Sequence, residues 1–330
     1  MYQANKKKLF AVAPMMDWTD RHCRFFHRLM SKRALLYTEM VVADAILRGD
    51  RDYLLNYNEE EYPIALQLGG SDPQKLAQAA KISVEYGYNE INLNVGCPSD
   101  RVQSGTFGAC LMREPELVGR CVAAMKEVVD VPVTVKCRIG VDEQDTQIAL
   151  DNLANEIWGK GADALWVHAR KAWLEGLSPK ENRDIPPLDY ARVYALKAEN
   201  ENHFIGINGG VEDLIQSAEH LKKCDGVMLG RVAYHNPSLL RHVDQHLFSD
   251  EVPPSTYDEI LDAMCEYAER HLIKGGKLSH ITRHMIGLFQ GRSGAKIYRQ
   301  ILSTQSTIVE AGPEVLRQAF DAIENKVQAA

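Results

Sequence analysis

The sequence predicts an α/β protein: a closed (β/α)8 TIM barrel followed by a small all-helical C-terminal domain. Eight short apolar runs recur along the chain, helical stretches separate them, and the alternation stops at a proline-containing segment near residue 250. The chain has 330 residues, of which 45% are hydrophobic and 25% charged. This composition is ordinary for a folded protein and excludes a disordered or collagen-like chain. A barrel of roughly 250 residues leaves room for a second domain.

The strands are expected in the eight apolar runs. These runs are 10–14, 35–39, 64–68, 91–95, 133–137, 164–169, 204–208 and 226–230. Several are apolar almost throughout, as expected for parallel strands that are buried on both faces. An open doubly wound sheet fits less well, because it usually has five or six strands and a GxGxxG turn after the first. The residues after the first run, Ala13-Pro14-Met15-Met16, form no such turn.

Helices are expected between the strands. Asp72 and Pro73 are an N-cap and first-turn pair, and Gly87 marks the end of that helix. Apolar residues at helical spacing indicate further helices at 115–129, 143–159, 187–199, 211–224 and 231–248. Residues 249–255 are typical of a linker, and only helices are expected from 256 onward. The predicted domains are a barrel at 1–248, a linker at 249–255 and a helical domain at 256–330.

Polar or conformationally special residues follow all eight predicted strands. Active sites of barrels lie at this C-terminal end of the strands. One such residue would be an ordinary strand cap, whereas a complete ring indicates a single cavity. The residues are Pro14, Met15, Glu39, Gln67, Asn94, Cys97, Lys136, Arg138, His168, Arg170, Asn208, Gly209, Gly210, Gly230 and Arg231.

The residues after the seventh and eighth strands predict a phosphate site. Asn208-Gly209-Gly210 and Gly230-Arg231 lie where many barrels bind phosphate on backbone N–H groups and a helix N-terminus. Glycine permits a close backbone approach, and arginine adds a charge-assisted hydrogen bond. Glycines are equally common in left-handed turns, so a purely structural role is the alternative.

Four further residues have more than one chemical interpretation. Lys136 suits a Schiff-base nucleophile, a phosphate partner or a cation beside a flavin. Gln67 suits a hydrogen bond to the edge of a flat heterocycle, and His168 suits a ligand, an acid or a structural histidine. Cys97, held between Gly96 and Pro98, suits a nucleophile or a general acid. The stretch 99–112 that follows it is a candidate lid.

A basic segment stands out in an acidic protein. The formal net charge is −7, yet residues 270–300 hold seven Lys and Arg and no Asp or Glu. Charge runs are usually solvated surface, but a segment of one sign favours a nucleic-acid phosphate backbone. A membrane surface is the less favoured partner, since no strong apolar face accompanies the charge. A second basic group follows the sixth strand. It consists of Arg170, Lys171, Lys180 and Arg183, with Trp173 among them.

Several classes of protein are disfavoured by simple patterns. No apolar run of about 18 residues predicts a membrane span, and the polar N-terminal segment favours a cytoplasmic location. The seven cysteines include no CxxC pair and no zinc spacing. Free thiols and no bound metal are therefore expected.

Taken together, these motifs resemble the tRNA-dihydrouridine synthases, most closely their A subfamily. The resemblance covers nearly the whole chain, and the stretches 178–183 and 283–291 are similar to that subfamily in particular. The motifs are Ala13-Pro14-Met15, Ala65-Leu66-Gln67-Leu68-Gly69-Gly70-Ser71, Asn92-Leu93-Asn94-Val95-Gly96-Cys97-Pro98, Val135-Lys136-Cys137-Arg138, His168-Ala169-Arg170, Asn208-Gly209-Gly210 and Gly230-Arg231.

The resemblance implies an FMN enzyme that uses NADPH to reduce the C5–C6 bond of D-loop uridines in tRNA, at about positions 20 and 20a. Flavin N5 would give hydride to uracil C6, and the neutral thiol of Cys97 would give a proton to C5. The target base would have to be extruded from the folded RNA. The implied FMN contacts are Pro14, Met15, Met16, Gln67, Lys136, His168, Asn208, Gly209, Gly210, Gly230 and Arg231. The implied uracil and tRNA contacts are Asn94, Arg138, Lys180, Arg183, Arg292, Lys296 and Arg299.

Three other functions are carried as alternatives. A flavin barrel that acts on a free pyrimidine would share the cavity and the cysteine but would not explain the basic helical segment. An RNA-binding protein or chaperone on a degenerate barrel would bind no flavin. An aldolase- or isomerase-type barrel would use Lys136 as a Schiff base. A monomer is expected, and the choice between NADPH and NADH stays open.

Overall fold

A computed structural model describes residues 2, 8–99 and 107–327. Contacts divide the chain into two compact units. The first comprises Met1–Met16, Leu35–Tyr57 and Pro63–Gly230, and the second comprises Asp17–Ala34, Asn58–Tyr62 and Arg231–Ala330. This division falls at residue 230 rather than at the predicted linker. Helix α1 (Arg21–Met30) joins the second unit because it packs on α13 (Tyr257–Ile273) and α14 (Leu278–Met285), and the segment after residue 230 joins it because η3 (Pro237–His242) packs on α1.

The first unit contains the predicted barrel. Eight strands close into a ring in which each pairs in parallel with the next and β8 pairs with β1. Strand β2 runs three residues past the predicted end at 39, and its pairing with β3 shifts register between Tyr37 and Met40. The strands are β1 (Leu9–Val12), β2 (Leu35–Val42), β3 (Ile64–Gly69), β4 (Glu90–Val95), β5 (Val133–Arg138), β6 (Ala164–His168), β7 (Phe204–Asn208) and β8 (Gly226–Leu229).

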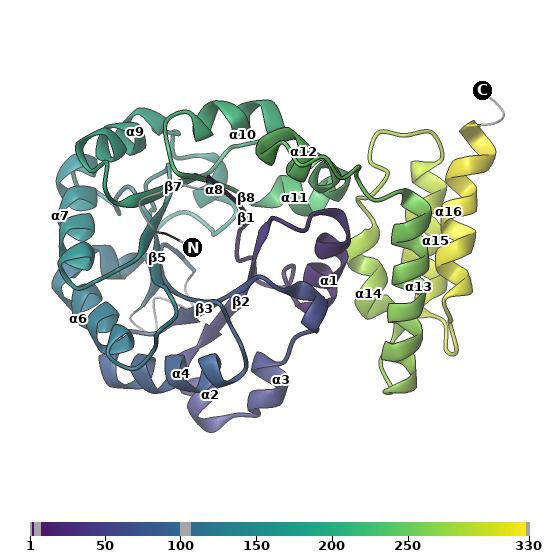
Figure 1. Cartoon of the computed structure of the whole chain (residues 1–330), viewed down its shortest axis with the longest axis horizontal. Helices are drawn as coiled ribbons and strands as arrows, with labels where there is room; N and C mark the ends of the chain where they lie inside the picture. The colour runs from purple at the N-terminus through teal and green to yellow at the C-terminus, as the bar shows by residue number, and fades with distance from the viewer. Residues whose placement is uncertain (1, 3–7, 100–106, 328–330) are drawn as a thin grey trace. The chain divides into compact units, whose positions relative to one another are not determined.

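Several helices of the first unit start at aspartate N-caps. Asp72, Asp145, Asp189 and Asp213 each accept hydrogen bonds from backbone N–H groups of the helix that follows. Helices α4, α6, α7, α9 and α10 lie outside the strands (Figure 1). The helices are α2 (Ala43–Arg48), α3 (Arg51–Leu55), α4 (Pro73–Glu85), η2 (Gly108–Arg113), α6 (Pro115–Lys126), α7 (Thr146–Gly159), α8 (Glu181–Asp184), α9 (Tyr190–Glu199) and α10 (Leu214–Leu221).

The barrel interior is filled around one large side chain. Trp166 of β6 is fully buried and belongs to a cluster with Tyr37, Phe204 and several small residues. Glycines on the next two strands make room for its ring: a Cβ at Gly206 would lie 2.1 Å from Trp166, and one at Gly226 would lie 2.6 Å away. The strand interior is therefore a packed core, which leaves the C-terminal mouth for a ligand.

The second unit is built of helices. The predicted helix at 231–248 is wrong, because the segment folds as three pieces: α11 (Arg231–His235), η3 (Pro237–His242) and α12 (Val243–Phe248). Pro237 has no N–H to continue a helical hydrogen-bond ladder, and Asn236 before it leaves the helical conformation. Helices α13 and α14 are followed by α15 (Ala295–Thr304), η4 (Gln305–Thr307) and α16 (Glu314–Val327), while η1 (Glu59–Glu61) also belongs to this unit.

Aromatic stacking and one buried ion pair hold the second unit together. The rings of Phe25 and Tyr267 stack with centroids 4.0 Å apart. Arg24 Nε donates to Glu61 Oε2 at 2.6 Å, and both side chains are at most 5% exposed. Within the described ranges, the helices include none with the length and apolarity needed to cross a bilayer. All seven cysteines are free, as expected.

Candidate active site

Two neighbouring strands carry alternating polar residues. On β4 these are Glu90, Asn92 and Asn94, and on β5 they are Thr134, Lys136 and Arg138. Side chains two residues apart point to the same face of a strand. The strands pair with Asn92 beside Thr134 and Asn94 beside Lys136, so the two rows run side by side along the barrel.

The predicted ligand-binding amides Gln67 and Asn94 are hydrogen-bonded to each other. Asn94 Nδ2 donates to Gln67 Oε1 at 2.7 Å, and Gln67 Nε2 donates to Asn92 Oδ1 at 2.8 Å. Gln67 is 1% exposed and Asn94 9% exposed. The two side chains therefore have one fixed arrangement at the base of the mouth.

The candidate acid, Cys97, lies directly after β4 on a loop that is tied at both sides. Asn94 Oδ1 accepts hydrogen bonds from the N–H groups of Gly96, at 3.1 Å, and Cys97, at 3.0 Å. The Cys97 carbonyl accepts from the N–H of Ala109 at 2.9 Å. The thiol is partly exposed, so it is accessible while its backbone is held. Residues 100–106 of the predicted lid lie outside the described residues.

Lys136 and His168 lie close together at the mouth. Lys136 Nζ donates to Asn208 Oδ1 at 3.1 Å, and the Asn208 side chain donates in turn to the carbonyl of Met228. Burial, helped by the charge of Arg138, lowers the pKa of Lys136 to about 8. Burial, followed by the charges of Arg138 and Lys136, also holds the pKa of His168 well below its usual range. The imidazole is therefore neutral at physiological pH.

The glycines after β7 have conformations that only glycine adopts easily. Gly209 has φ +108° and Gly210 has φ +67°. A Cβ at Gly209 would lie 2.5 Å from the His168 ring, and one at Gly210 would lie 2.4 Å from Leu188. Gly230 differs, because a Cβ there would meet only the Met15 sulfur, 4.0 Å away. Gly230 thus borders open space at the end of β8.

The remaining predicted cofactor contacts have varied surroundings. Pro14 and Met15 are half-buried and directly follow β1, and Met15 packs against the core cluster of the barrel. Met16 is 54% exposed. Arg231 is the first residue of α11 and belongs to the second unit.

Arg138 holds loops together. Its guanidinium donates to three backbone carbonyls: Gly96 at 3.1 Å, Lys171 at 3.0 Å and Asn182 at 2.7 Å. The residue is only 3% exposed. These contacts fasten the Cys97 loop to the loop after β6, a role that the sequence motifs, which assign Arg138 to the uracil, do not reveal.

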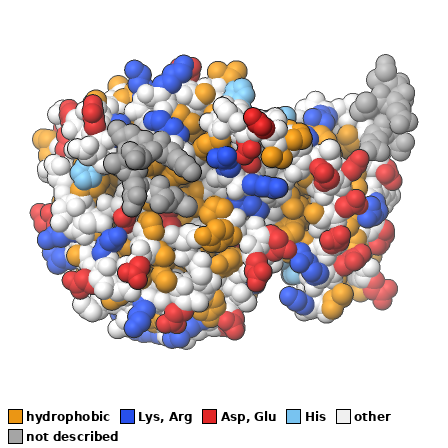
Figure 2. All heavy atoms as spheres, viewed as in Figure 1, with side chains coloured by type: hydrophobic (Ala, Val, Ile, Leu, Met, Phe, Trp, Pro, Cys, Tyr) orange, Lys and Arg blue, Asp and Glu red, His pale blue; other side chains and the backbone are white. Residues whose placement is uncertain are grey.

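The acid-free segment 270–300 is partly neutralised by acids from other parts of the second unit. Arg270 pairs with Glu60, and Arg283 pairs with Asp20. Arg292, Lys296 and Arg299 are exposed. Arg292 stacks over Tyr257, with its Cζ 4.7 Å from the ring centroid. Basic and acidic side chains are interspersed on the face drawn in Figure 2. The two ion pairs offset part of the positive charge that the sequence of this segment suggested.

The other predicted tRNA contacts belong to the first unit. Lys180 and Arg183 are exposed and lie at the short helix α8, in the loop after β6. The buried Asn182 side chain ties this loop internally, accepting from the Trp173 N–H at 2.7 Å and donating to the Trp173 carbonyl at 2.8 Å. The loop therefore displays its two cations from a defined backbone.

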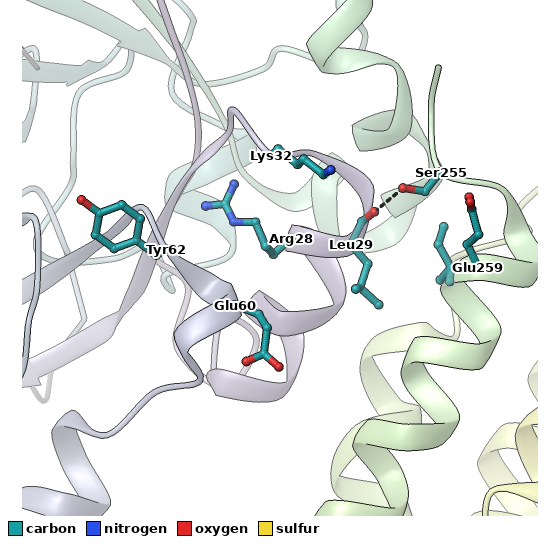
Figure 3. A pocket seen from close by; sticks show the side chains of 8 residues that line it. Arg28, Leu29, Lys32, Glu60, Tyr62, Ser255 and Glu259 are labelled. Atoms are coloured by element: carbon teal, nitrogen blue, oxygen red, sulfur yellow. Dashed lines mark hydrogen bonds between the residues drawn. The ribbon is translucent and has the colours of Figure 1, made fainter. Parts of the chain in front are cut away.

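A separate hollow lies in the second unit. Its volume is about 460 Å³, and its lining includes Arg28, Lys32, Glu60 and Glu259. Figure 3 shows these side chains and the hydrogen bond that Ser255 donates to the Leu29 carbonyl. It contains none of the residues that the motifs singled out.

Sequence reasoning missed Glu90, Asn92 and Thr134 as parts of the site. The sequence contained a signal for them. Each lies an even number of residues before Asn94 or Lys136 on the same strand and therefore shares a face with it. Reading only the ends of the strands overlooked the residues below them.

The fold and the mouth define a (β/α)8-barrel enzyme whose functional side chains follow the strands. Among solved structures, morphinone reductase is similar, with a TM-score of 0.51, 12% identity and coverage of 77% of this chain and 89% of that one. This likeness concerns the fold alone. The family model described as Dihydrouridine synthase (Dus) matches residues 11–324.

The chain belongs to the dihydrouridine synthase family. Its relatives include proteins named tRNA-dihydrouridine(20/20a) synthase, among them those of three organisms. The protein of Shewanella oneidensis is 56% identical over 325 residues, covering 98% of this chain and 97% of the relative. The protein of Vibrio parahaemolyticus is 58% identical over 314 residues, covering 95% and 96%. The protein of Escherichia coli is 54% identical over 318 residues, covering 96% and 92%.

Proposed function

We propose that this protein is an FMN-dependent tRNA-dihydrouridine synthase that uses NADPH and reduces uridines 20 and 20a of the D-loop. The observation that carries the proposal is the held Cys97 beside Lys136, His168 and Asn208 at one barrel mouth, in a chain of this family. A cytoplasmic monomer is the form we propose, and light scattering of the purified protein checks the oligomeric state.

The mouth suits a phosphorylated flavin. Gly230 borders open space, the Gly209-Gly210 turn offers backbone N–H groups, and Lys136 provides a cation with few competing partners. Gln67, Lys136 and His168 would hold the ring system, while Asn208, Gly209, Gly210, Gly230 and Arg231 would hold the phosphate. Pro14, Met15 and Met16 would cover one side. When bound, FMN would supply hydride for the C5–C6 bond of uracil.

Cys97 would supply the proton. A thiol is a suitable general acid only if it is held within hydrogen-bond reach of the carbon that accepts the proton. The two hydrogen bonds of the Cys97 backbone provide that restraint. The neutral ring of His168 avoids adding a further positive charge near Lys136. Asn94 would orient the uracil, and Arg138 would fix the loop that carries Cys97.

The tRNA would be held mainly through phosphates. Lys180 and Arg183 extend from the loop after β6, and Arg292, Lys296 and Arg299 extend from the helical unit. Exposed cations of this kind give salt-dependent affinity without sequence readout. The uridine itself would enter the mouth as an extruded base.

The visible spectrum of the purified protein tests the proposal. Flavin bands that bleach with NADPH under anaerobic conditions, and return on addition of tRNA lacking dihydrouridine, are the expected result. A colourless protein that takes up no FMN would overturn it. Bands that return with free uracil or orotate but not with tRNA would favour the free-pyrimidine alternative.

A further inference from the structure

A continuous chain of hydrogen bonds runs through the interior of the barrel below the mouth. Thr134 Oγ1 donates to Glu90 Oε1 at 2.5 Å, and Asn92 Nδ2 donates to Thr134 Oγ1 at 2.8 Å. The chain continues through Gln67 and Asn94 to the backbone of Cys97. Glu90, Asn92 and Thr134 are each fully buried.

Every hydrogen bond in this chain points the same way, and the upper end requires that direction. At the upper end, the N–H groups of Gly96 and Cys97 can only donate, so the Asn94 oxygen must face them. The Asn94 nitrogen then faces Gln67, and the same choice passes down through Asn92 to Thr134. The amide orientations follow from the network rather than from an arbitrary assignment.

The lower end supplies the terminal acceptor. Glu90 receives the hydroxyl of Thr134 together with those of Tyr37 and Tyr2, each at 2.5 Å. Burial raises the pKa of this carboxyl group, while the hydroxyl hydrogen bonds oppose that rise. These three hydrogen bonds satisfy both carboxyl oxygens of the buried Glu90 side chain and so fix its position in the core.

We propose that Glu90, Thr134 and Asn92 are positioning residues that set the orientation of Gln67 and Asn94 and thereby hold the loop of Cys97. The inference rests on the proposed function and extends it to residues that do not themselves contact the reacting atoms. Each amide nitrogen uses one of its two hydrogens in the chain. The other hydrogen of Gln67 and of Asn94 is left for an acceptor on a bound heterocycle, which matches a carbonyl-bearing pyrimidine edge.

Breaking the chain at Thr134 would disturb both ends. Without the hydroxyl, Asn92 Nδ2 loses its acceptor, and a buried unpaired donor is costly. Turning Asn92 over would place its nitrogen against that of Gln67, and turning Gln67 and Asn94 in sequence would place a donor against the N–H of Cys97. The network has no relaxed alternative, so the restraint on the loop weakens.

The test uses Thr134→Val, which removes the hydroxyl at nearly constant shape, and Thr134→Ser, which keeps it. Alkylation of Cys97 by iodoacetamide in the FMN-free protein is followed by peptide mass spectrometry, with Cys110 as the internal reference. We expect Thr134→Val to increase the rate of Cys97 alkylation about fivefold and to weaken FMN binding by a similar factor. This is the effect of about one buried hydrogen bond. Thr134→Ser should restore both values.

Two further variants separate this role from general destabilisation. Thr282 is also buried and donates to Ser306 Oγ at 2.9 Å, but it lies in the second unit. Thr282→Val should lower the melting temperature and leave Cys97 alkylation unchanged. Glu90→Gln keeps an acceptor for Thr134, so its Cys97 alkylation should stay within about twofold of the parent. Parent-like Cys97 alkylation in Thr134→Val would overturn the proposal, whatever Glu90→Gln does.

Neutron diffraction on crystals of the parent protein keeps the test decisive if Thr134→Val does not fold. We expect a deuteron on Thr134 Oγ1 that points toward Glu90 and one on Asn94 Nδ2 that points toward Gln67. A reversed amide at Asn92 or Gln67 would overturn the proposed chain of hydrogen bonds. None of these readouts needs turnover. If the protein were inactive on tRNA but showed the expected alkylation pattern, the proposed function would be contradicted while the positioning role of Glu90, Asn92 and Thr134 would still be supported.

Discussion

Lys136 Nζ donates a hydrogen bond to Oδ1 of Asn208 at 3.1 Å, which joins β5 to β7 across the mouth of the barrel. Because Asn208 is itself anchored on the Met228 carbonyl, the ammonium group is held at a fixed point among the proposed flavin contacts. Its charge, and therefore its contribution to cofactor binding, depends on pH.

The pKa of Lys136, lowered to about 8, predicts that FMN binds more weakly as pH rises from 7 to 9. Lys136 is charged below this pKa and neutral above it, so the attraction to an anionic ligand is lost on the alkaline side. We expect roughly a tenfold rise in Kd, since a charge-assisted hydrogen bond contributes about 1.5–3 kcal/mol. Quenching of flavin fluorescence measures the affinity. Lys136→Met should bind weakly at every pH, and an unchanged pH slope in that variant would assign the titration to another group.

The Cys97 thiol is predicted to affect turnover and not binding. Replacing Cys97 by Ala should leave the flavin spectrum and the tRNA affinity intact and lower single-turnover dihydrouridine formation by about 10²–10⁴-fold, the usual contribution of a general acid. Cys110→Ala is the matched control, because Cys110 is a second partly exposed thiol whose Sγ contacts the Phe107 carbonyl. Normal turnover by the Cys97 variant would remove it as the proton donor.

Substitutions of Arg138 test whether this residue anchors the loops or contacts the uracil directly. Its three carbonyl partners predict that Arg138→Met lowers the melting temperature by roughly 5 °C and also slows turnover. Arg138→Lys should rescue little, because an ammonium group cannot reproduce the guanidinium fork. Arg120→Met is a control at an exposed position of α6. Differential scanning fluorimetry and kinetics together decide the matter. A raised KM for tRNA at unchanged melting temperature would favour direct contact with the substrate.

The barrel was predictable because its signals are local. Most strands are largely apolar runs, as a parallel sheet buried on both faces requires, and several helices start at a polar cap that follows a turn. Three helices begin three residues later than the expected starts at 143, 187 and 211. Their N-caps are Asp145, Asp189 and Asp213, and these aspartates mark the true starts. The break at Pro237 was likewise readable from its missing N–H.

The site was predictable only at the ends of strands. Motifs identified the residues at the mouth, but they could not show that the Arg138 guanidinium is occupied by three carbonyls. Nor could the sequence show that Asp20 and Glu60, distant along the chain, neutralise part of the basic segment. Both depend on contacts between residues far apart in sequence, which periodicity does not encode.

The salt dependence of tRNA binding tests which basic residues bind phosphate. Removing one cation that binds a phosphate should reduce the slope of log Kd against log salt by about 0.7–0.9. Replacing Arg292, Lys296 and Arg299 together by Gln should therefore lower the slope by about 2–3, and the double variant of Lys180 and Arg183 by up to about 2. Arg317→Gln is the control, because this exposed arginine of the same helical unit pairs with Asp262 at 3.0 Å. Filter binding between roughly 50 and 200 mM salt covers the useful range. If the triple variant keeps the parent slope while the double variant shows a smaller one, the tRNA backbone is held by the loop after β6 and not by the helical unit.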